Sequence, residues 1–229
     1  MKIVVSGASR GLGNALVKNL LSQGDEVFAF ARSTENISKL TAQNTNKGKL
    51  YFMAFDLMEK DFSPLVKTIK EKLQTIDALV NNAGFLVPKP FIEMTDEDFN
   101  RMFDVNVKAP FKLIRELFPL FSKGSHILNI SSAGGFQGSV KFPGLSLYSA
   151  SKGALSILTE SLAMEFAKEE IKVNALALGS AQTEMLAQAF PNYKAPLTAD
   201  EMAEFIAYFT VNGHKFFNGK ILPVSLSTP

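Results

Sequence analysis

The sequence of 229 residues contains no cysteine and only two histidines, His126 and His214, which lie far apart along the chain. Without cysteine, the protein has neither disulfide bonds nor thiolate metal ligands. Two separated histidines are too few for the usual histidine-based zinc site. We therefore expect a protein without a metal centre.

Long apolar runs and runs of like charge are also missing. No segment approaches the roughly 20 apolar residues that a membrane-spanning helix needs, and the apolar run after Met1 is too short for a signal peptide. Lysine and arginine are scattered, and the formal net charge is only +2, so nothing indicates a nucleic-acid surface. These absences predict a cytoplasmic protein with no membrane or nucleic-acid partner.

Short apolar segments alternate with helical patterns along the whole chain. This alternation predicts a single α/β domain over residues 1–229. The expected strands are 3–5, 26–31, 50–55, 76–80, 126–130, 171–177 and 220–224. The expected helices are 12–23, a weak segment at 37–40, 67–73, 96–121, 147–167 and 199–211. Pro223 in the last expected strand places that strand at a sheet edge.

A glycine-rich turn joins the first expected strand to the first expected helix. Gly7, Gly11 and Gly13 form a G-x-x-x-G-x-G pattern. Glycine lets the backbone approach a pyrophosphate closely, and the free N–H groups at a helix N-terminus attract its negative charge. The pattern predicts a dinucleotide site, although its spacing differs from the more common G-x-G-x-x-G.

The second expected strand ends at Arg32-Ser33, about 20 residues after the glycines. An acidic residue at this place favours NAD(H), whereas a basic residue accommodates the 2′-phosphate of NADP(H). Arg32, with Arg10 in the glycine turn as a second guanidinium, therefore predicts NADP(H) rather than NAD(H). The alternative is that both arginines are solvated and that nearby Glu35 serves NAD(H).

Other polar residues follow later strands. Asp56 comes after the third strand, where it either lines a ligand site or caps a helix, and the amide-rich stretch 81–84 follows the fourth. Pro110 lies within the expected helix 96–121 and cannot donate to the carbonyl of Asn106. That free carbonyl either marks a hydrated kink or holds a functional water.

Tyr148 and Lys152 are spaced to share one face of a helix. An ammonium beside a phenol favours the phenolate, so we expect Lys152 to lower the pKa of Tyr148 and to prepare it for proton exchange. Ser131 and Ser132 end the fifth strand, and because strand side chains alternate, only one of them can face the same cleft.

Together, the glycine turn, the stretch Asn82-Ala83-Gly84, Asn106, the paired serines and Tyr148-x-x-x-Lys152 resemble the short-chain dehydrogenase/reductase family. The resemblance implies a single Rossmann-like, doubly wound domain with a seven-stranded parallel sheet. It implies that Tyr148 is the general acid/base, that Lys152 binds the nicotinamide ribose, and that Asn106 holds a relay water through its main chain. Ser132 matches the serine that polarises the substrate carbonyl, with Ser131 as the alternative.

The resemblance also implies which residues contact the dinucleotide. Asp56 and Leu57 resemble the adenine contact, and Thr183 resembles the contact to the nicotinamide carboxamide. The full expected set is Gly7, Ser9, Arg10, Gly11, Leu12, Gly13, Arg32, Ser33, Asp56, Leu57, Asn82, Ala83, Gly84, Tyr148, Lys152, Gly179 and Thr183.

The resemblance predicts an NADP(H)-dependent oxidoreductase that acts on a small carbonyl or alcohol substrate. A dinucleotide-binding sensor or scaffold without turnover is the alternative. The substrate loop is expected within about residues 180–199, where the chain is short for the family and another subunit could complete the cleft. The strongly apolar helices 96–121 and 147–167 resemble the family's paired-helix interface and predict a homodimer or homotetramer.

Overall fold

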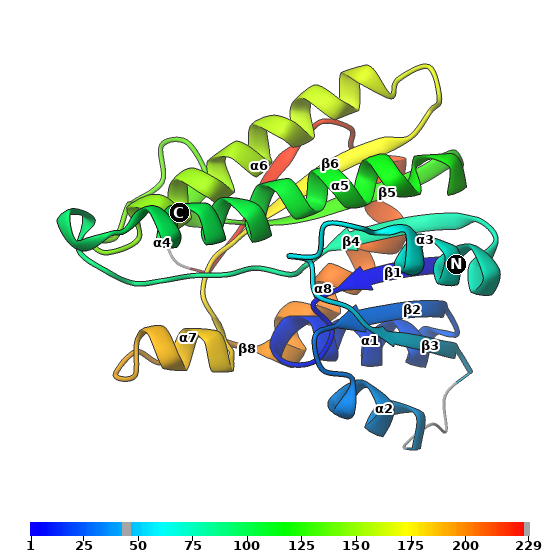
Figure 1. Cartoon of the computed structure of the whole chain (residues 1–229), viewed down its shortest axis with the longest axis horizontal. Helices are drawn as coiled ribbons and strands as arrows, with labels where there is room; N and C mark the ends of the chain where they lie inside the picture. Colours follow the sequence, from blue (N-terminus) through cyan, green and yellow to red (C-terminus); the bar gives the residue numbers. More distant parts are fainter. Residues whose placement is uncertain (43–46, 227–229) are drawn as a thin grey trace.

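The computed structural model describes residues 1–42 and 47–226 (Figure 1). The strands are β1 (Lys2–Ser6), β2 (Glu26–Ala31), β3 (Lys49–Ala54), β4 (Ile76–Asn81), β5 (Phe121–Ser132), β6 (Lys172–Leu178), β7 (Ala181–Gln182), β8 (Leu197–Thr198) and β9 (Ile221–Val224). The α-helices are α1 (Gly11–Gln23), α2 (Glu35–Ala42), α3 (Ser63–Leu73), α4 (Asp96–Phe103), α5 (Ala109–Leu117), α6 (Ser146–Glu165), α7 (Glu184–Ala189) and α8 (Ala199–Asn212). The shorter helical turns are η1 (Phe91–Glu93), η2 (Asp104–Lys108), η3 (Phe118–Leu120), η4 (Ala133–Gly135) and η5 (Gly213–Lys215).

Seven of these strands form one parallel sheet in the order β3-β2-β1-β4-β5-β6-β9. The order reverses between β1 and β4, because the chain winds outward from β1 in one direction and then from β4 in the other. Ligands bind at such a switch point, beyond the carboxyl ends of the strands. The predicted doubly wound, seven-stranded parallel sheet is confirmed.

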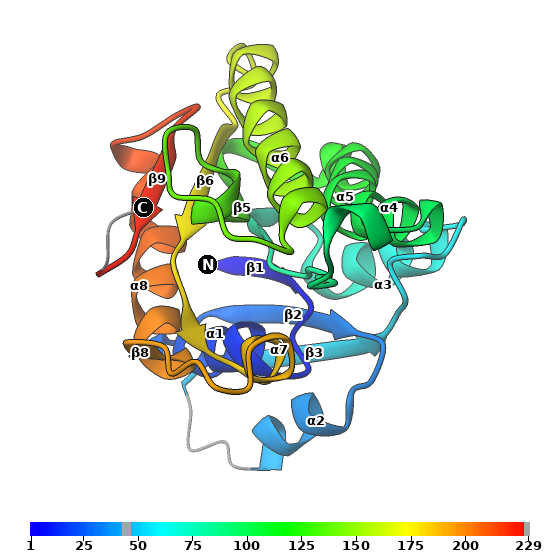
Figure 2. The ribbon, with the colours of Figure 1, turned by 90° about the vertical axis from the view of Figure 1, so that its left-hand side faces the viewer.

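Helices cover both faces of the sheet and form two apolar cores. On one face α1, α2 and α8 pack against the strands, and on the other face α3, α5 and α6 do so (Figures 1 and 2). The central strands are buried from both sides, as their nearly continuous apolar sequences require. This rigid sheet fixes the positions of the loops at its carboxyl edge.

The expected helix 96–121 is helical from α4 through η3, but it is not one regular helix. Residues Asp104–Lys108 form a π-helical turn, in which the N–H of Ala109 donates to the carbonyl of Asp104. Pro110 follows directly and supplies no N–H, so this widened turn occurs where the regular hydrogen-bond ladder cannot continue. Asn106 lies in the middle of the turn.

The segment 180–199 contains regular structure that the sequence analysis did not predict. Strands β7 and β8 pair in parallel, and the short helix α7 lies between them. Thr183 caps α7 by accepting a hydrogen bond from the N–H of Leu186 at 3.2 Å. The fifth strand also begins earlier than expected, at Phe121 rather than His126, whereas Pro223 lies in edge strand β9 as predicted.

Residues 1–42 and 47–226 show neither a membrane-spanning helix nor a metal-binding cluster. No helix there is long and apolar enough to cross a membrane. The same residues contain no group of three or more histidine, aspartate or glutamate side chains placed to bind a metal ion.

Candidate active site

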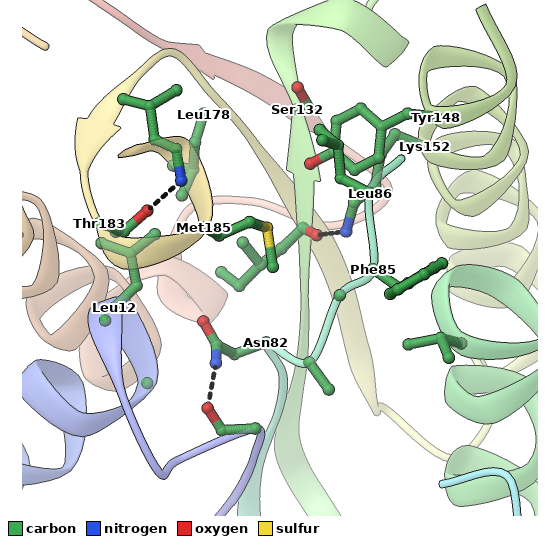
Figure 3. A pocket seen from close by; sticks show the side chains of 18 of the residues that line it. Leu12, Asn82, Phe85, Leu86, Ser132, Tyr148, Lys152, Leu178, Thr183 and Met185 are labelled. Atoms are coloured by element: carbon green, nitrogen blue, oxygen red, sulfur yellow. Dashed lines mark hydrogen bonds between the residues drawn. The ribbon is translucent and has the colours of Figure 1, made fainter. Parts of the chain in front are cut away.

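A cavity of about 530 Å³ lies at the carboxyl edge of the sheet. Most of its lining comes from the carboxyl ends of β1 through β6 and the segments that follow them, together with α6 and α7. Arg101 of α4, Val105 of η2 and Ser225 complete it. Figure 3 shows Tyr148, Lys152 and Ser132 on one side of this cavity and Leu12, Asn82 and Thr183 on the other. The cavity therefore joins the glycine turn to the Tyr148 helix.

The glycine turn forms a close backbone cradle at one end of the cavity. A β-carbon on Gly7 would lie 2.7 Å from the α-carbon of Ala83, and one on Gly13 would lie 2.5 Å from the side-chain nitrogen of Asn82. Gly7 and Gly11 also adopt positive φ angles of 69° and 53°. Both the contacts and the backbone conformation therefore require glycine.

Asn82 holds the cradle in place. Its side-chain amide donates to the carbonyls of Ser6 at 3.0 Å and Gly7 at 3.1 Å, and the Ser6 hydroxyl accepts from the N–H groups of Asn82 and Ala83. These bonds connect the ends of neighbouring strands β1 and β4. The Asn82-Ala83-Gly84 stretch thus shapes the glycine turn as well as lining the cavity.

The N-terminus of α1 is suited to an anion. No side chain caps it, and its first turn contains no acidic residue. The free N–H groups of this turn and the helix dipole therefore favour a phosphate group. The cradle and this helix end fit the pyrophosphate of a dinucleotide.

The predicted adenosine contacts lie farther along the same cavity. Arg10, Arg32, Asp56 and Leu57 all line it, but Ser33 does not. Glu35, the acidic alternative for a ribose contact, lies outside the lining and pairs with Lys39 at 3.2 Å. Arg10 and Arg32 are therefore the described cations that line this part of the cavity.

Ser132, rather than Ser131, faces Tyr148. The Ser132 hydroxyl accepts a hydrogen bond from the N–H of Gly134 at 3.2 Å, and it interacts with the Tyr148 hydroxyl closely enough to lower the pKa of that phenol. The Ser131 hydroxyl instead donates to the carbonyl of Lys152 at 3.0 Å. Strand alternation therefore directs the two serines differently, and Ser131 holds α6 against β5.

Lys152 is almost fully buried under the Tyr148 ring. Its ammonium nitrogen donates to the carbonyl of Ile130 at 2.8 Å and lies 5.9 Å from the centre of the ring (Figure 3). Burial lowers the pKa of Lys152 to about 8. The ammonium is thus positioned by the end of β5, beside the cavity.

The sequence predicted that Lys152 lowers the pKa of Tyr148. In the protein without a bound cofactor this prediction is wrong. Burial raises the pKa of Tyr148 to about 12, and the neighbouring Ser132 hydroxyl offsets this rise only in part. The cost of burying a phenolate therefore exceeds the stabilisation that the polar neighbours provide. At neutral pH the phenol carries its proton, which is the form that donates.

Asn106 is fully buried and does not line the cavity. Its side chain accepts from the N–H of Phe85 at 2.8 Å, and it donates to the carbonyl of Phe85 at 2.8 Å and to the Ser151 hydroxyl at 2.9 Å. This bidentate contact fixes the segment after Gly84 beside α6. The side chain of Asn106 is therefore a positioning group, and a water held by its main chain stays a prediction.

Comparison with known proteins agrees with this geometry. The sequence model of the family described as short chain dehydrogenase matches residues 1–194. The chain belongs to the short-chain dehydrogenase family.

Similar members of this family cover nearly the whole chain. Nodulation protein G of Rhizobium sp. (strain N33) is 32% identical over 98% of this chain and 95% of its own length. A Burkholderia cenocepacia short-chain dehydrogenase in complex with NADP is 25% identical, has a TM-score of 0.85, and matches 97% of this chain and 95% of its own. A 4-hydroxyisoleucine dehydrogenase mutant complexed with NADH and succinate is 26% identical, has a TM-score of 0.84, and matches 98% of this chain and 96% of its own.

For this short-chain dehydrogenase, sequence reasoning identified most of the polar cavity lining but little of the apolar lining. Among the predicted site residues, only Ser33 and Asn106 lie outside the lining. The lining residues that were missed are mainly apolar or aromatic, and they include Phe85, Leu86, Val105, Val140, Phe142, Leu145, Met185, Leu186, Ala189, Phe190 and Tyr193. An apolar residue in a loop gives no signal in the sequence that separates it from core, so only the structure reveals this set.

Proposed function

We propose that this short-chain dehydrogenase is an NADP(H)-dependent oxidoreductase that transfers a hydride between the nicotinamide and a carbonyl or alcohol substrate. The observation that carries the proposal is the placement of the Ser132 and Tyr148 hydroxyls together on one side of a dinucleotide-sized cavity. Two hydroxyl donors on the same side of the cavity suit a carbonyl oxygen that becomes an alkoxide.

The chain's own residues would hold the cofactor. The amides at the start of α1 and the glycine cradle suit the pyrophosphate, Asp56 and Leu57 suit the adenine, and Lys152 suits the nicotinamide ribose. When bound, the dinucleotide supplies or accepts the hydride. Arg10 and Arg32 support NADP(H), because they provide positive charge where a 2′-phosphate would lie.

In the reducing direction, Tyr148 gives its proton to the substrate oxygen and Ser132 stabilises the developing negative charge. The raised pKa of Tyr148 supports this role, since the phenol is fully protonated near neutral pH. Lys152, with its pKa lowered by burial to about 8, lines the same cavity and would return a proton to the phenolate. Asn106 contributes by holding Phe85 and Ser151 in position, which orients α6.

A homodimer or homotetramer is part of the same proposal. Helices α5 and α6 lie side by side on one face of the sheet (Figures 1 and 2). Phe111 on α5 is 44% exposed, and Ile157 and Met164 on α6 are 63% and 78% exposed. Exposed apolar groups on two adjacent helices favour packing against a second copy of the chain.

The reaction can be tested with NADPH and a panel of ketones, aldehydes and β-ketoacyl thioesters by following the cofactor absorbance at 340 nm. Wild-type protein should oxidise NADPH with at least one panel member, and Tyr148→Phe should lose about 10²- to 10⁴-fold in kcat while it still binds NADPH. Circular dichroism of the variant should match the wild type. NADPH binding without turnover of any compound would instead indicate the non-catalytic sensor or scaffold.

A further inference from the structure

Charged groups are distributed unequally along the cavity. The charged side chains that line it are Arg10, Arg32, Asp56, Arg101, Lys152 and Glu184. The first three follow β1, β2 and β3, at the end assigned to adenosine. A carboxylate oxygen of Glu184 lies 3.4 Å from the point where a β-carbon on Gly11 would stand, which places it at the phosphate cradle.

The two remaining cations are engaged with the protein. The Arg101 guanidinium lies 4.2 Å from the centre of the Phe85 ring, and the Lys152 ammonium donates to the carbonyl of Ile130 at 2.8 Å. Lys152 also belongs to the reaction centre itself. The loop 136–145 and the part of the lining that follows Glu184 therefore contribute no charged side chain to the described lining.

The loop 136–145 directs apolar side chains into the cavity and keeps its only cation away. Val140 and Phe142 line the cavity and are 54% and 58% exposed. Lys141 stands between them, but its ammonium donates to the carbonyls of Phe136 at 2.7 Å and Ser139 at 3.1 Å. The loop thus satisfies its lysine internally and presents an apolar surface to a ligand.

This apolar surface is held in a defined position. The N–H of Lys89 donates to the carbonyl of Gly144 at 3.0 Å, and Lys89 pairs with Asp98 at 3.0 Å. These contacts tie the loop to the segment that carries Phe85 and Leu86 and to the start of α4. In Figure 3, Leu86 lies beside Tyr148, so apolar surface begins directly at the reacting hydroxyls.

Helix α7 closes the opposite side with a second apolar surface. Met185, Leu186 and Ala189 line the cavity from one side of this short helix, followed by Phe190. Figure 3 shows the Met185 side chain pointing into the cavity toward Leu86. The hydroxyls of Ser180 and Tyr193 hydrogen-bond at 2.9 Å and hold the two ends of this segment together.

We propose that the substrate is an uncharged, mainly apolar ketone or aldehyde. This inference rests on the proposed function. The carbonyl oxygen faces Ser132 and Tyr148, while an aromatic or aliphatic body contacts Val140, Phe142 and Met185. A carboxylate or phosphate held against Val140, Phe142 and Met185 would lose hydration and gain no cation from loop 136–145 or from α7, which disfavours its binding. In the reaction, the carbonyl carbon receives the hydride, the oxygen receives the Tyr148 proton, and NADPH is oxidised to NADP⁺.

A matched pair of ketones tests this specificity. Ethyl benzoylformate and benzoylformate share the same phenyl ketone, but only the second carries a negative charge. With NADPH we expect kcat/KM for the ester to exceed that for the anion by at least about 100-fold. Equal kcat/KM values, or a preference for benzoylformate, would overturn the inference.

Variants of loop 136–145 test whether this loop causes the preference for the uncharged ester. Phe142→Ala should raise KM for ethyl benzoylformate by about 10-fold and should affect butane-2,3-dione, which has no ring, much less. Phe142→Arg should reduce the ratio of kcat/KM for ethyl benzoylformate to kcat/KM for benzoylformate. Phe91→Ala removes a ring that is 68% exposed and lies outside the cavity lining, so it should change neither KM.

A binding measurement separates this inference from the proposed function. Both benzoylformate compounds are titrated into the NADP⁺ complex, in which no reduction is possible. Tighter binding of the ester supports an apolar site even if no ketone is turned over, whereas equal binding rejects it. Reduction of butane-2,3-dione without any preference for the ester would leave the oxidoreductase function standing and remove only the apolar substrate class.

Discussion

Gly13 has no room for a β-carbon, because that atom would collide with the carbonyl oxygen of Gly7 and lie 2.5 Å from the side-chain nitrogen of Asn82. The same Asn82 nitrogen donates to the Gly7 carbonyl at 3.1 Å. The first helix, the first strand and the fourth strand therefore meet at one point without spare volume. This close contact sets the shape of the phosphate cradle.

Gly13→Ala should consequently displace the cradle. We expect at least a 10-fold loss of NADPH affinity, measured by fluorescence titration, together with a lower melting temperature. Gly153→Ala in α6 is the control, since its β-carbon would meet its nearest neighbour, the Gly135 carbonyl, at an ordinary 3.5 Å. That control should gain about 0.5–1 kcal/mol in stability. Unchanged NADPH affinity in Gly13→Ala would contradict the assignment of the cradle.

Arg32→Asp should change the preference between the two nicotinamide cofactors. A carboxylate at this position repels a 2′-phosphate and accepts hydrogen bonds from a ribose hydroxyl, so the Kd for NADPH should rise far more than the Kd for NADH. Lys39→Asp, which reverses the same charge outside the cavity lining, is the control. If Arg32→Asp raised the Kd for NADPH and the Kd for NADH equally, Arg32 would not be the residue that binds the 2′-phosphate.

His126 should make the fold sensitive to acid. The ring nitrogen Nδ1 hydrogen-bonds to the carbonyl of Thr210 at 3.0 Å, and Nε2 accepts from the side chain of Asn174 at 3.2 Å, which describes a neutral imidazole. Burial, assisted by nearby His214, lowers the pKa of His126 to about 4 from an ordinary 6.5. Below pH 6.5 the unfolded chain therefore binds a proton that the folded chain excludes, so stability falls as the pH decreases toward 4.

Urea unfolding should show this loss as about 2 kcal/mol between pH 6.5 and pH 5. His126→Gln should be less stable at neutral pH, but it should lose most of that pH dependence relative to the wild type. His214→Gln is the comparison variant: His214 is only partly buried, so this substitution should leave most of the pH dependence in place. An undiminished pH slope in His126→Gln would show that other groups control the acid transition.

Sedimentation at micromolar concentration should give a dimer or tetramer. Ile157→Glu should shift the protein toward the monomer, because it places a charge among the exposed apolar groups of α5 and α6. Lys18→Glu, on the helix layer across the sheet, should leave the assembly unchanged. A monomeric wild-type protein would contradict the proposed association.

The sequence by itself determined where most strands lie along the chain and most of the polar residues of the site. Apolar runs, the glycine turn and the four-residue spacing of Tyr148 and Lys152 are local signals, and the backbone geometry of strands, turns and helices converts them directly into positions. The α/β class and nearly all of the expected polar lining follow from such signals.

Only the tertiary structure decided the direction of the Tyr148 pKa shift, the choice between the two serines, and the apolar lining of the cavity at the proposed substrate end. The raised pKa of Tyr148 results from protein packed around it by distant segments, and the choice between Ser131 and Ser132 depends on which side of β5 α6 covers. The apolar surface of Val140 and Phe142 likewise depends on Lys141 turning back onto its own loop. Burial and loop conformation depend on contacts between residues far apart in the chain, so no local pattern encodes them.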